Sequence, residues 1–292
     1  MPKHQLYFGD NLDILRTHLP DESVHLIYID PPFNTGKRRR HVQLQVAQDP
    51  EGGRVGFQGR RYRAQAGGAA QYEDAFESSE AYLRFLRPRF EEARRVLHPD
   101  GSFFLHIDCR ESHYCKVMLD ELFGRASFMN EIIWAYDYGG RSKSRWPAKH
   151  DNIFWYAKNP KRYTFNYEEL DRIPYMAPGL VSREKAARGK TPTDVWWHTI
   201  VATNGREKTG YPTQKPLGVL NRIVKAHSSP GDTLLDFFAG SGTFGEAAAL
   251  HGRSSILVDN NPSAVETIMR RMRPYGLVWV NKNADSAPTR ET

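Results

Sequence analysis

A carboxylate, two prolines and an aromatic ring follow one another near the start of the chain, as Asp30, Pro31, Pro32 and Phe33. Residues 26–29 before them are mostly apolar, which is typical of a buried strand. Proline lacks an N–H group and fixes its own φ, so the chain must leave the sheet here. Open α/β sheets bind ligands at the carboxyl ends of their strands. The stretch therefore predicts either a plain turn or a site in which a carboxylate, a carbonyl and a ring face one ligand.

A glycine-rich turn lies near the other end of the chain, between a predicted strand at residues 233–238 and a predicted helix at 243–250. Its glycines follow the G-x-G-x-x-G spacing: Gly240, Gly242 and Gly245. The next predicted strand, residues 255–258, is followed by Asp259. Such glycines let the backbone approach a ligand closely, and a carboxylate after the second strand can bind ribose hydroxyls. We therefore predict a cofactor that contains a ribose.

The order of these two motifs constrains the fold. A nicotinamide cofactor usually has the glycine unit first, with several strands after it, but only 33 of the 292 residues follow Asp259. The remaining strands must come from the amino-terminal part of the chain. We therefore predict an α/β fold with a permuted, mostly parallel sheet, in which Asp30 and the glycine turn lie at the same edge.

Apolar periodicity predicts the other elements. We expect helices at residues 12–18, 80–97, 114–123, 215–226 and 262–272, the first of them capped by Asp10 or Asn11. We expect further strands at residues 6–8, 24–29, 102–107, 131–136, 152–156 and 278–280. Pro88 lies inside the second helix and could kink or divide it.

Three segments lack this periodicity. Residues 36–71 contain the basic run 37–40 and four further arginines, and we expect a long surface loop, either inert or ordered by nucleic-acid phosphates. The connection 139–146 combines glycine, basic residues and tryptophan, which is common in nucleic-acid contacts. Residues 159–204 are mixed in character and could form a small lobe, where the tryptophans at 196–197 either pack or face DNA.

The composition is that of a globular protein, with 39% hydrophobic and 26% charged residues. A formal net charge of +7 makes a polyanionic partner plausible. No apolar run is long enough for a membrane helix, and the first residues do not resemble a signal peptide, so we expect a cytoplasmic protein. Two cysteines do not suggest a disulfide framework.

Four motifs together resemble the permuted β group of S-adenosylmethionine-dependent DNA amino-methyltransferases. Asp30 to Phe33 correspond to the family's [DNS]-P-P-[FYW] motif. Residues 236–243 resemble its D-P-F-x-G-S-G-T motif, with Phe237 in place of the usual proline. Residues 211–216 resemble its T-Q-K-P segment, and Gly9-Asp10 matches a smaller acidic motif. The resemblance spans most of the chain and implies a circularly permuted, Rossmann-like methyltransferase fold.

The resemblance implies S-adenosylmethionine as the cofactor. Lys215 and Thr213 would hold its carboxylate end, Asp236 would face its amino end and Asp259 its ribose, while Asp10 would border the cofactor or the target base. The complete predicted cofactor set is Asp10, Thr213, Lys215, Asp236, Phe238, Ala239, Gly240, Ser241, Gly242, Thr243, Asp259 and Asn260.

The resemblance also implies how the target amine is held. Asp30 and the Pro31 carbonyl would each accept a hydrogen bond from an exocyclic amine, with Pro32 completing the turn and Phe33 stacking on the base. A base inside a duplex cannot reach this edge, so it must be flipped out. The partner is double-stranded DNA, and a homodimer is left open. The predicted DNA contacts are Arg38, Arg39, Arg40, Arg141, Lys143, Arg145 and Trp146.

The domain organisation follows from these assignments. Residues 1–158, with a basic loop insertion at 37–72, would form the catalytic half of the methyltransferase domain. Residues 205–292 would form its cofactor-binding half. The lobe at residues 159–204 would recognise the target sequence. We expect the enzyme in a bacterial-type cytoplasm, associated with the nucleoid through DNA.

Several alternatives remain open from the sequence. Asp at the first motif position favours N6 of adenine, and N4 of cytosine is the alternative because both amines need the same chemistry. Methylation of RNA or of a protein glutamine is disfavoured because those families usually place the glycine motif first. A catalytically dead DNA-binding protein is disfavoured by the intact Asp30, Gly240, Gly242 and Lys215.

One short segment contains residue types that could bind a metal or act as nucleophiles, but its spacing favours neither role. Its members crowd into ten residues: His106, Asp108, Cys109, His113 and Cys115. They lie across the end of a predicted strand and the start of a helix, with a spacing that matches no common zinc pattern. We therefore expect no metal, and neither cysteine as a nucleophile.

Overall fold

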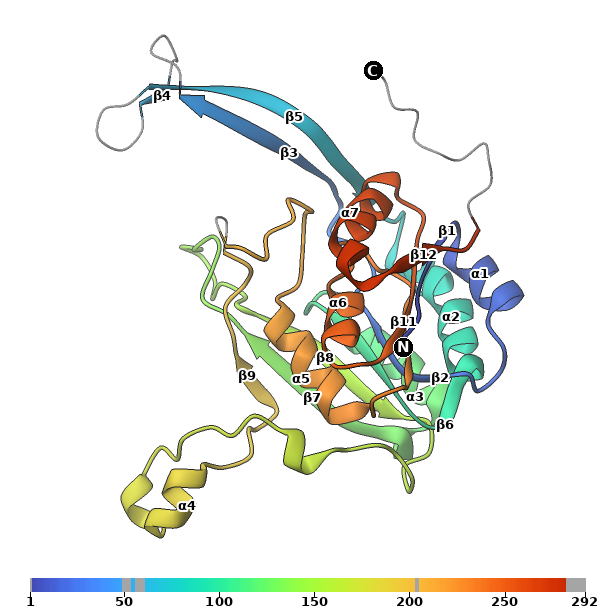
Figure 1. Cartoon of the computed structure of the whole chain (residues 1–292), viewed down its shortest axis with the longest axis vertical. Helices are drawn as coiled ribbons and strands as arrows, with labels where there is room; N and C mark the ends of the chain where they lie inside the picture. Colours follow the sequence, from blue (N-terminus) through green and yellow to red (C-terminus); the bar gives the residue numbers. More distant parts are fainter. Residues whose placement is uncertain (1, 49–53, 56–60, 203–204, 282–292) are drawn as a thin grey trace.

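A computed structural model describes residues 2–48, 54–55, 61–202 and 205–281. Most of the chain is built around a sheet of nine strands in the order β12-β1-β11-β10-β2-β6-β8-β7-β9 (Figure 1). The strand bounds are β1 His4–Phe8, β2 Val24–Ile29, β6 Leu97–Ile107, β7 Phe128–Ala135, β8 His150–Ala157, β9 Val195–Trp197, β10 Thr233–Asp236, β11 Ser254–Asp259 and β12 Leu277–Trp279.

Helices cover both faces of this sheet. The longer helices are α1 Asn11–His18, α2 Ser79–Val96, α3 Ser112–Phe123, α5 Leu217–His227, α6 Thr243–Leu250 and α7 Pro262–Met272. Side chains of β2 alternate between the faces, as the pleat requires. Ile27 and Ile29 lie in the core cluster that α1, α2 and α3 cover, whereas Leu26 and Tyr28 lie in the cluster covered by α5 and α6. The predicted α/β fold is therefore confirmed.

The sheet has the predicted permuted order. The strands β10 and β11 from the carboxyl-terminal part of the chain lie between β1 and β2 from the amino-terminal part, and all these neighbours pair in parallel. Strand β8 is antiparallel to both β6 and β7. The carboxyl ends of β1, β11, β10 and β2 consequently meet at one edge, which places Asp259, the glycine turn and Asp30 side by side.

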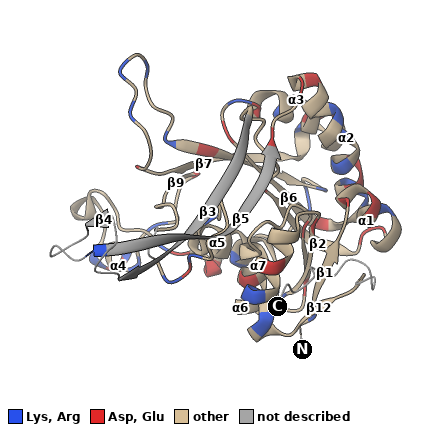
Figure 2. Cartoon of the chain, turned by 90° about the horizontal axis from the view of Figure 1, so that it is seen from above, with Lys and Arg blue, Asp and Glu red and all other residues tan. Residues whose placement is uncertain are grey.

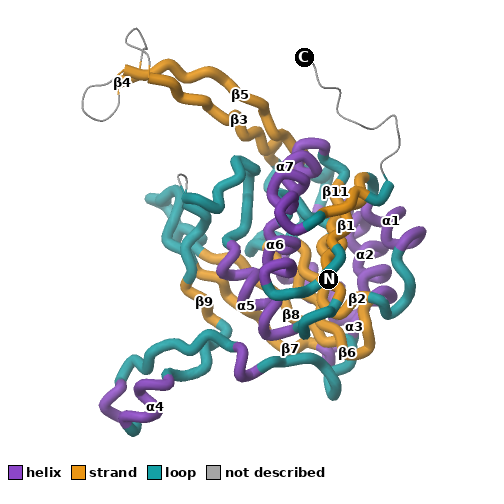
Figure 3. Tube along the Cα trace, in the orientation of Figure 1, coloured by secondary structure: helices purple, strands orange, loops and turns teal. Residues whose placement is uncertain are grey.

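The prediction of a loop at residues 36–71 was wrong. The described part of this segment forms strands β3 Lys37–Gln48, β4 Arg54–Val55 and β5 Arg61–Asp74, which pair in antiparallel fashion with one another. They stand off the main body as a long hairpin (Figures 1 and 3). A projecting hairpin need not bury one face against a core. An alternating apolar pattern is therefore not required. The sequence nevertheless alternates over part of β3, with Val42, Leu44 and Val46 separated by glutamines, and the interpretation as a loop overlooked this signal.

Residues 158–194 connect β8 to β9 and contain the short helix α4 Arg183–Arg188. Because β8 is antiparallel to its neighbours, this connection begins at the edge opposite the carboxyl ends of β2 and β10. Figure 3 shows it as a largely irregular segment that extends away from the sheet. Strand β9 then pairs in parallel with β7 and brings the chain back to the carboxyl edge. Trp196 is buried and Trp197 is exposed, so the two neighbours differ in environment.

Most of the remaining boundaries lie close to the predictions, but β6 begins at Leu97 rather than at residue 102, and β7 begins at Phe128 rather than at residue 131. Strand β2 and helices α6 and α7 begin and end at the predicted residues, and α2 runs through Pro88 without a break. Helix α5 begins two residues later than predicted, because Lys215 and Pro216 precede it in extended structure. Among the helices in the described ranges, none combines the length and the apolar character that a bilayer span requires.

Candidate active site

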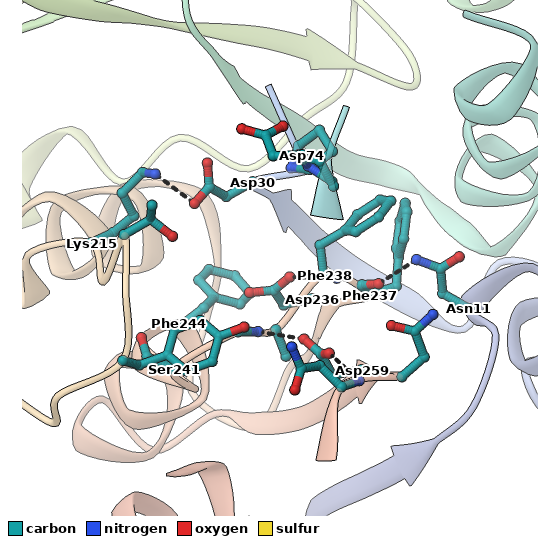
Figure 4. Close-up of a pocket in the computed structure, with 18 of the residues that line it drawn as sticks. Asn11, Asp30, Asp74, Lys215, Asp236, Phe237, Phe238, Ser241, Phe244 and Asp259 are labelled. Atoms are coloured by element: carbon teal, nitrogen blue, oxygen red, sulfur yellow. Dashed lines mark hydrogen bonds and ion pairs between the residues drawn. The ribbon is translucent and has the colours of Figure 1, made fainter. Parts of the chain in front are cut away.

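A pocket of about 620 Å³ opens at the carboxyl edge of the sheet. Its walls come from the turns after β1, β2, β10 and β11, from the end of β5, from α2 and from the segment before α5. Every predicted catalytic residue lines it, and so does every predicted cofactor residue except Gly242. The two motifs are some 200 residues apart in the sequence, and the permuted sheet brings them into one cavity (Figure 4).

Asp30 is held by a cation. Lys215 donates a hydrogen bond from Nζ to Oδ2 of Asp30 at 2.5 Å (Figure 4). The side chains are 10% and 18% exposed, respectively. The other carboxylate oxygen, Oδ1, is buried and accepts no hydrogen bond from the described residues. The sequence analysis expected Lys215 to hold the cofactor's carboxylate. In the structure, the ammonium group of Lys215 pairs with Asp30.

Phe33 lies beside the same cation. The Nζ atom of Lys215 is 4.9 Å from the centroid of the Phe33 ring, which is a cation–π distance. The next residue, Asn34, has φ +51°. Its side chain donates to Glu111 Oε1 at 2.8 Å and accepts from the Phe76 backbone N–H at 3.1 Å. This pair of hydrogen bonds fixes the turn after Phe33 against the rest of the domain.

Asp259 organises the glycine turn. Its Oδ2 accepts the Gly240 N–H and its Oδ1 accepts the Asn261 N–H, both at 2.8 Å. Burial raises the pKa of Asp259 to about 6, although these backbone donors act in the opposite direction. Gly240 has φ +50°, and a Cβ there would lie 3.3 Å from the Tyr211 ring. The turn thus presents a carboxylate and close backbone to the pocket, as the sequence predicted.

Two glycines of the motif serve packing. Gly242 caps α6 with φ +73°, and a Cβ there would come within 3.1 Å of Ile268 on α7. A Cβ on Gly245 would lie 2.6 Å from Leu257 of β11, so the helix could not approach the strand as it does. Gly242 was predicted as a cofactor residue; the structure places it outside the pocket lining, at the α6–α7 contact.

Asp236 is a deeply buried carboxylate of the pocket, with 4% of the residue exposed. Its Oδ1 accepts the Phe238 N–H at 3.0 Å. Burial raises the pKa of Asp236 well above its usual range, the charges of Asp30 and Asp259 raise it further, and Lys215 counteracts them. A cationic ligand group would therefore be favoured here.

Asp10 and its neighbour have structural partners. Asp10 caps α1 by accepting the N–H groups of Leu12 and Asp13, and Oδ2 forms an ion pair with Arg89 at 2.7 Å. Asn11 donates to the Phe237 carbonyl at 2.6 Å and accepts from the same arginine. Asp10 still lines the pocket, so its predicted position at the cofactor or base stays a prediction.

Thr213 lies in the pocket wall with φ +59°. This left-handed conformation is costly for a β-branched residue and occurs mostly at ligand sites and turns. The neighbouring Gln214 stabilises the segment, because its side chain accepts the Thr209 N–H at 2.8 Å and donates to the Glu207 carbonyl at 2.6 Å. The predicted contact of Thr213 with a cofactor carboxylate stays a prediction.

A buried hydrogen-bond chain lies behind Phe33. Asp151 accepts from Tyr136 at 3.1 Å and pairs with Nε2 of His106 at 3.0 Å, while Nδ1 of His106 pairs with the Tyr28 hydroxyl at 2.7 Å. The His106 and Phe33 ring centroids are 6.0 Å apart. These hydrogen bonds give His106 a structural role, as the link between Tyr28 and Asp151.

The described residues contain no group of three or more His, Cys, Asp or Glu side chains placed to hold a metal ion. Of the two cysteines, Cys109 is exposed and Cys115 is buried. Burial raises the pKa of the Cys115 thiol to about 12, so it stays protonated at neutral pH.

The predicted DNA contacts of the connection after β7 do not line the pocket. Residues 137–148 form an exposed loop beyond β7, and Trp146 within it is 95% exposed. Figure 2 shows this loop projecting from the body with its basic positions in blue. The loop carries Arg141, Lys143, Arg145 and Trp146. Arg38, Arg39 and Arg40 belong to β3, but their side chains lie outside the described part.

The sequence analysis missed several lining residues. They are Asn11, Asp74, Phe76, Phe85, Arg89, Tyr211, Phe244 and Asn261. Tyr211 belongs to the recognised segment 211–216 but was given no role, and Asn261 directly follows the predicted residue Asn260. Arg89 and Phe85 follow the ordinary periodicity of α2. Asp74 ends a segment that was interpreted as a loop, and no local signal marks these three.

Comparison with known proteins agrees with this site. The family model for N6/N4 methyltransferases, described as DNA methylase, matches residues 24–270. The type II methyltransferase M.HpaI of Haemophilus parainfluenzae is 28% identical over 255 residues, which cover 87% of this chain and 70% of that protein. The DNA adenine methyltransferase YhdJ of Escherichia coli K12 is 29% identical over 272 residues, covering 90% and 81%. The solved PvuII DNA methyltransferase (cytosine-N4-specific) superposes with a TM-score of 0.63 at 16% identity, covering 93% and 87%.

The chain belongs to the N6/N4 DNA methylase family, since the family model spans most of its length. It is a DNA methyltransferase with a Rossmann-like fold. This family uses S-adenosylmethionine as its methyl donor.

Proposed function

We propose that this enzyme transfers a methyl group from S-adenosylmethionine to the exocyclic amino group of a flipped base in double-stranded DNA, with N6 of adenine favoured. The observation that carries this proposal is the open Oδ1 of Asp30. It is a buried acceptor next to Pro31 and Phe33, in the same pocket as the glycine turn. A base amine supplies the N–H donor that such an oxygen lacks.

The residues of the pocket fit the cofactor. A volume of about 620 Å³ lies within the range of ligand pockets. Asp259 offers acceptors suited to ribose hydroxyls, and the deeply buried Asp236 suits a positively charged ligand. When bound, the cofactor supplies a methyl group already activated by a sulfonium, so the chemistry needs no metal.

The catalytic residues then act mainly by positioning. The lone pair of an exocyclic amine is delocalised into its base, which makes it a poor nucleophile. Asp30 and the Pro31 carbonyl accept hydrogen bonds from the amine and favour a more pyramidal nitrogen. Phe33 stacks on the base, Pro32 keeps the turn rigid, and positive charge developing on the nitrogen is stabilised by the carboxylate.

The duplex is held by elements at the same edge of the sheet. The loop at residues 137–148 follows β7, whose carboxyl end points to the edge that carries Asp30. We propose that Arg141, Lys143 and Arg145 contact phosphates and that Trp146 stacks on bases. The hairpin of β3 and β5 is a second candidate DNA contact, through Arg38, Arg39 and Arg40. Residues 159–204 remain the proposed target-recognition lobe.

Two features favour adenine over cytosine. The first motif residue is Asp, which is more usual in N6-adenine enzymes, and the relative YhdJ is named a DNA adenine methyltransferase. Methylation of N4 of cytosine by the same residues is the alternative, and PvuII methyltransferase of the same fold is cytosine-specific by name.

An enzyme of this kind acts on chromosomal DNA, so we propose the cytoplasm, in association with the nucleoid, as its location. Assembly into a homodimer is a separate prediction that sedimentation in solution tests.

Incubation of the protein with radiolabelled S-adenosylmethionine and double-stranded DNA tests the proposal. We expect label in the DNA and none in RNA or protein. Asp30→Ala is the matched control, because it removes the amine acceptor and leaves the glycine turn intact. We expect this variant to bind the cofactor with unchanged affinity and to lose at least about a hundredfold in kcat. Normal transfer by Asp30→Ala would refute the catalytic assignment, and cofactor binding without label in any DNA would refute the enzyme proposal.

A further inference from the structure

We propose that Lys215 is a positioning residue for the target amine: its ammonium holds Oδ2 of Asp30, so that Oδ1 is presented to the amine. This inference rests on the proposed function, because it assigns a role within methyl transfer. It differs from a role at the cofactor's carboxylate, and the two roles predict different defects.

The two oxygens of Asp30 are in different states. Oδ2 accepts from Lys215 Nζ at 2.5 Å, and Oδ1 is buried without a hydrogen-bond partner among the described residues. Both side chains are mostly shielded from water, with exposed fractions of 10% and 18%. A shielded ion pair holds its geometry better than an exposed one. The rotation of the carboxylate is thereby fixed, and one acceptor is left for a substrate donor.

The charges around Asp30 explain why a cation is required. Asp236, the last residue of β10, interacts electrostatically with both Asp30 and Asp259, and Lys215 opposes these carboxylates. The charge of Lys215 contributes to lowering the pKa of Asp151 on β8, and the charge of Asp30 contributes to raising the pKa of the Tyr28 hydroxyl on β2. Asp74, at the end of β5, lines the same pocket. Lys215 thus places a positive charge among several acidic groups in a poorly solvated cavity, where it holds Asp30 against their repulsion.

Lys215 contacts the aromatic part of the motif as well as the carboxylate. The same ammonium lies 4.9 Å from the Phe33 ring centroid. Lys215 therefore fixes both parts of the motif that hold the target base, the acceptor and the stacking ring.

The test compares Lys215→Met, Lys215→Arg and wild-type enzyme at saturating cofactor and DNA. We expect Lys215→Met to lower kcat by at least about tenfold. The cofactor Kd should change less than about twofold. Lys215→Arg keeps a cation beside Asp30 and should recover most of the lost rate.

Lys225→Met is the matched control. Lys225 is also an ion-paired lysine near the same helix, bound to Asp171 at the surface, and it lies outside the pocket. We expect this variant to behave as wild type. Circular dichroism and the cofactor Kd show that each variant is folded.

Three results would overturn the inference. A raised cofactor Kd with an unchanged kcat at saturation would place Lys215 at the cofactor. A loss of rate that Lys215→Arg does not recover would indicate a merely structural role, and full activity of Lys215→Met would exclude any role. The wild-type enzyme is assayed first on DNA: absence of transfer there contradicts the proposed function itself, whereas transfer by wild type with any of these three results contradicts only the role of Lys215.

Discussion

At the scale of single residues, the carboxylates of the pocket differ in their surroundings. Asp30 is paired with a lysine, Asp259 accepts two backbone N–H groups, and Asp236 is buried beside both. Burial raises the pKa of Asp236 and of Asp259, the latter to about 6. Similar residues in one cavity thus suit different ligand groups: an amine, ribose hydroxyls and a cation.

The pKa of Asp259 predicts how cofactor affinity depends on pH. Only the ionised carboxylate is a full acceptor for ribose hydroxyls, and with a pKa of about 6 it is protonated below that pH. Affinity should therefore be constant above pH 7 and weaken as the pH falls through 6, by up to about tenfold per unit. Isothermal titration calorimetry from pH 5 to pH 8 measures this.

Asp259→Asn separates this effect from other titrations, because the amide keeps an acceptor oxygen but does not ionise. We expect weaker binding at pH 7.5 and a smaller change between pH 7.5 and pH 5.5. Asp171→Asn, at a surface carboxylate bound to Lys225, should leave the cofactor affinity at pH 7.5 and its change with pH as in the wild type. A cofactor affinity that is flat from pH 5 to pH 8 in wild type would contradict the assignment of Asp259.

At the scale of elements, neighbouring strands are joined by buried side chains. His106 on β6 links Tyr28 on β2 to Asp151 on β8. His106→Leu would leave a buried hydroxyl and a buried carboxylate without this partner. We expect a loss of about 3 kcal/mol in the free energy of unfolding, measured by chemical denaturation. His113→Leu, at an exposed position on α3, should cost less than about 0.5 kcal/mol. Equal stabilities of the two variants would show that the chain of hydrogen bonds contributes nothing.

Elements that pack on the sheet could be predicted from the sequence, and the projecting ones could not. Strand β2 and helices α6 and α7 have a strong apolar pattern because each buries one or two faces. In the described part of the chain, β3, β4 and β5 form a separate sheet that stands off the body. Its apolar alternation is short, at Val42, Leu44 and Val46, and lies among many arginines and glycines, so the segment was interpreted as a loop. Motifs identified both ends of the site. The partner of Lys215 lies 185 residues away and depends on side-chain geometry, which no local pattern encodes.

At the scale of the whole molecule, the permuted chain brings separate parts of the sequence to one edge. The turns after β1, β2, β10 and β11 line the pocket, and the loop after β7 belongs to the same edge. Residues 158–194 leave from the opposite edge. The loop at residues 137–148 therefore lies on the side from which a flipped base would enter, and this position predicts where DNA is bound.

Replacing Arg141, Lys143 and Arg145 together by alanine tests this surface. Each lost phosphate contact should reduce the slope of log Kd against log salt by about 0.9, so the triple variant should lose up to about 2.7. DNA binding measured by fluorescence anisotropy at several salt concentrations gives the slope. The cofactor Kd should not change, because the loop does not line the pocket.

The same replacement on α4, at Arg183, Lys185 and Arg188, is the matched comparison. These side chains are also exposed, but they lie in the segment that leaves from the opposite edge. A reduced slope there would support DNA contacts by the proposed target-recognition lobe. An unchanged slope in the loop variant would contradict the DNA-binding assignment of Arg141, Lys143 and Arg145.

The central claim is that the pocket methylates an exocyclic amine of a DNA base. DNA treated with the enzyme and deuterated S-adenosylmethionine, digested to nucleosides and analysed by mass spectrometry, tests it most directly. We predict deuteromethyl groups on N6 of deoxyadenosine, in a product that Asp30→Ala does not form. Label on N4 of deoxycytidine would support the alternative base with the same site. Label on a ring carbon, or in no nucleoside at all, would contradict the account.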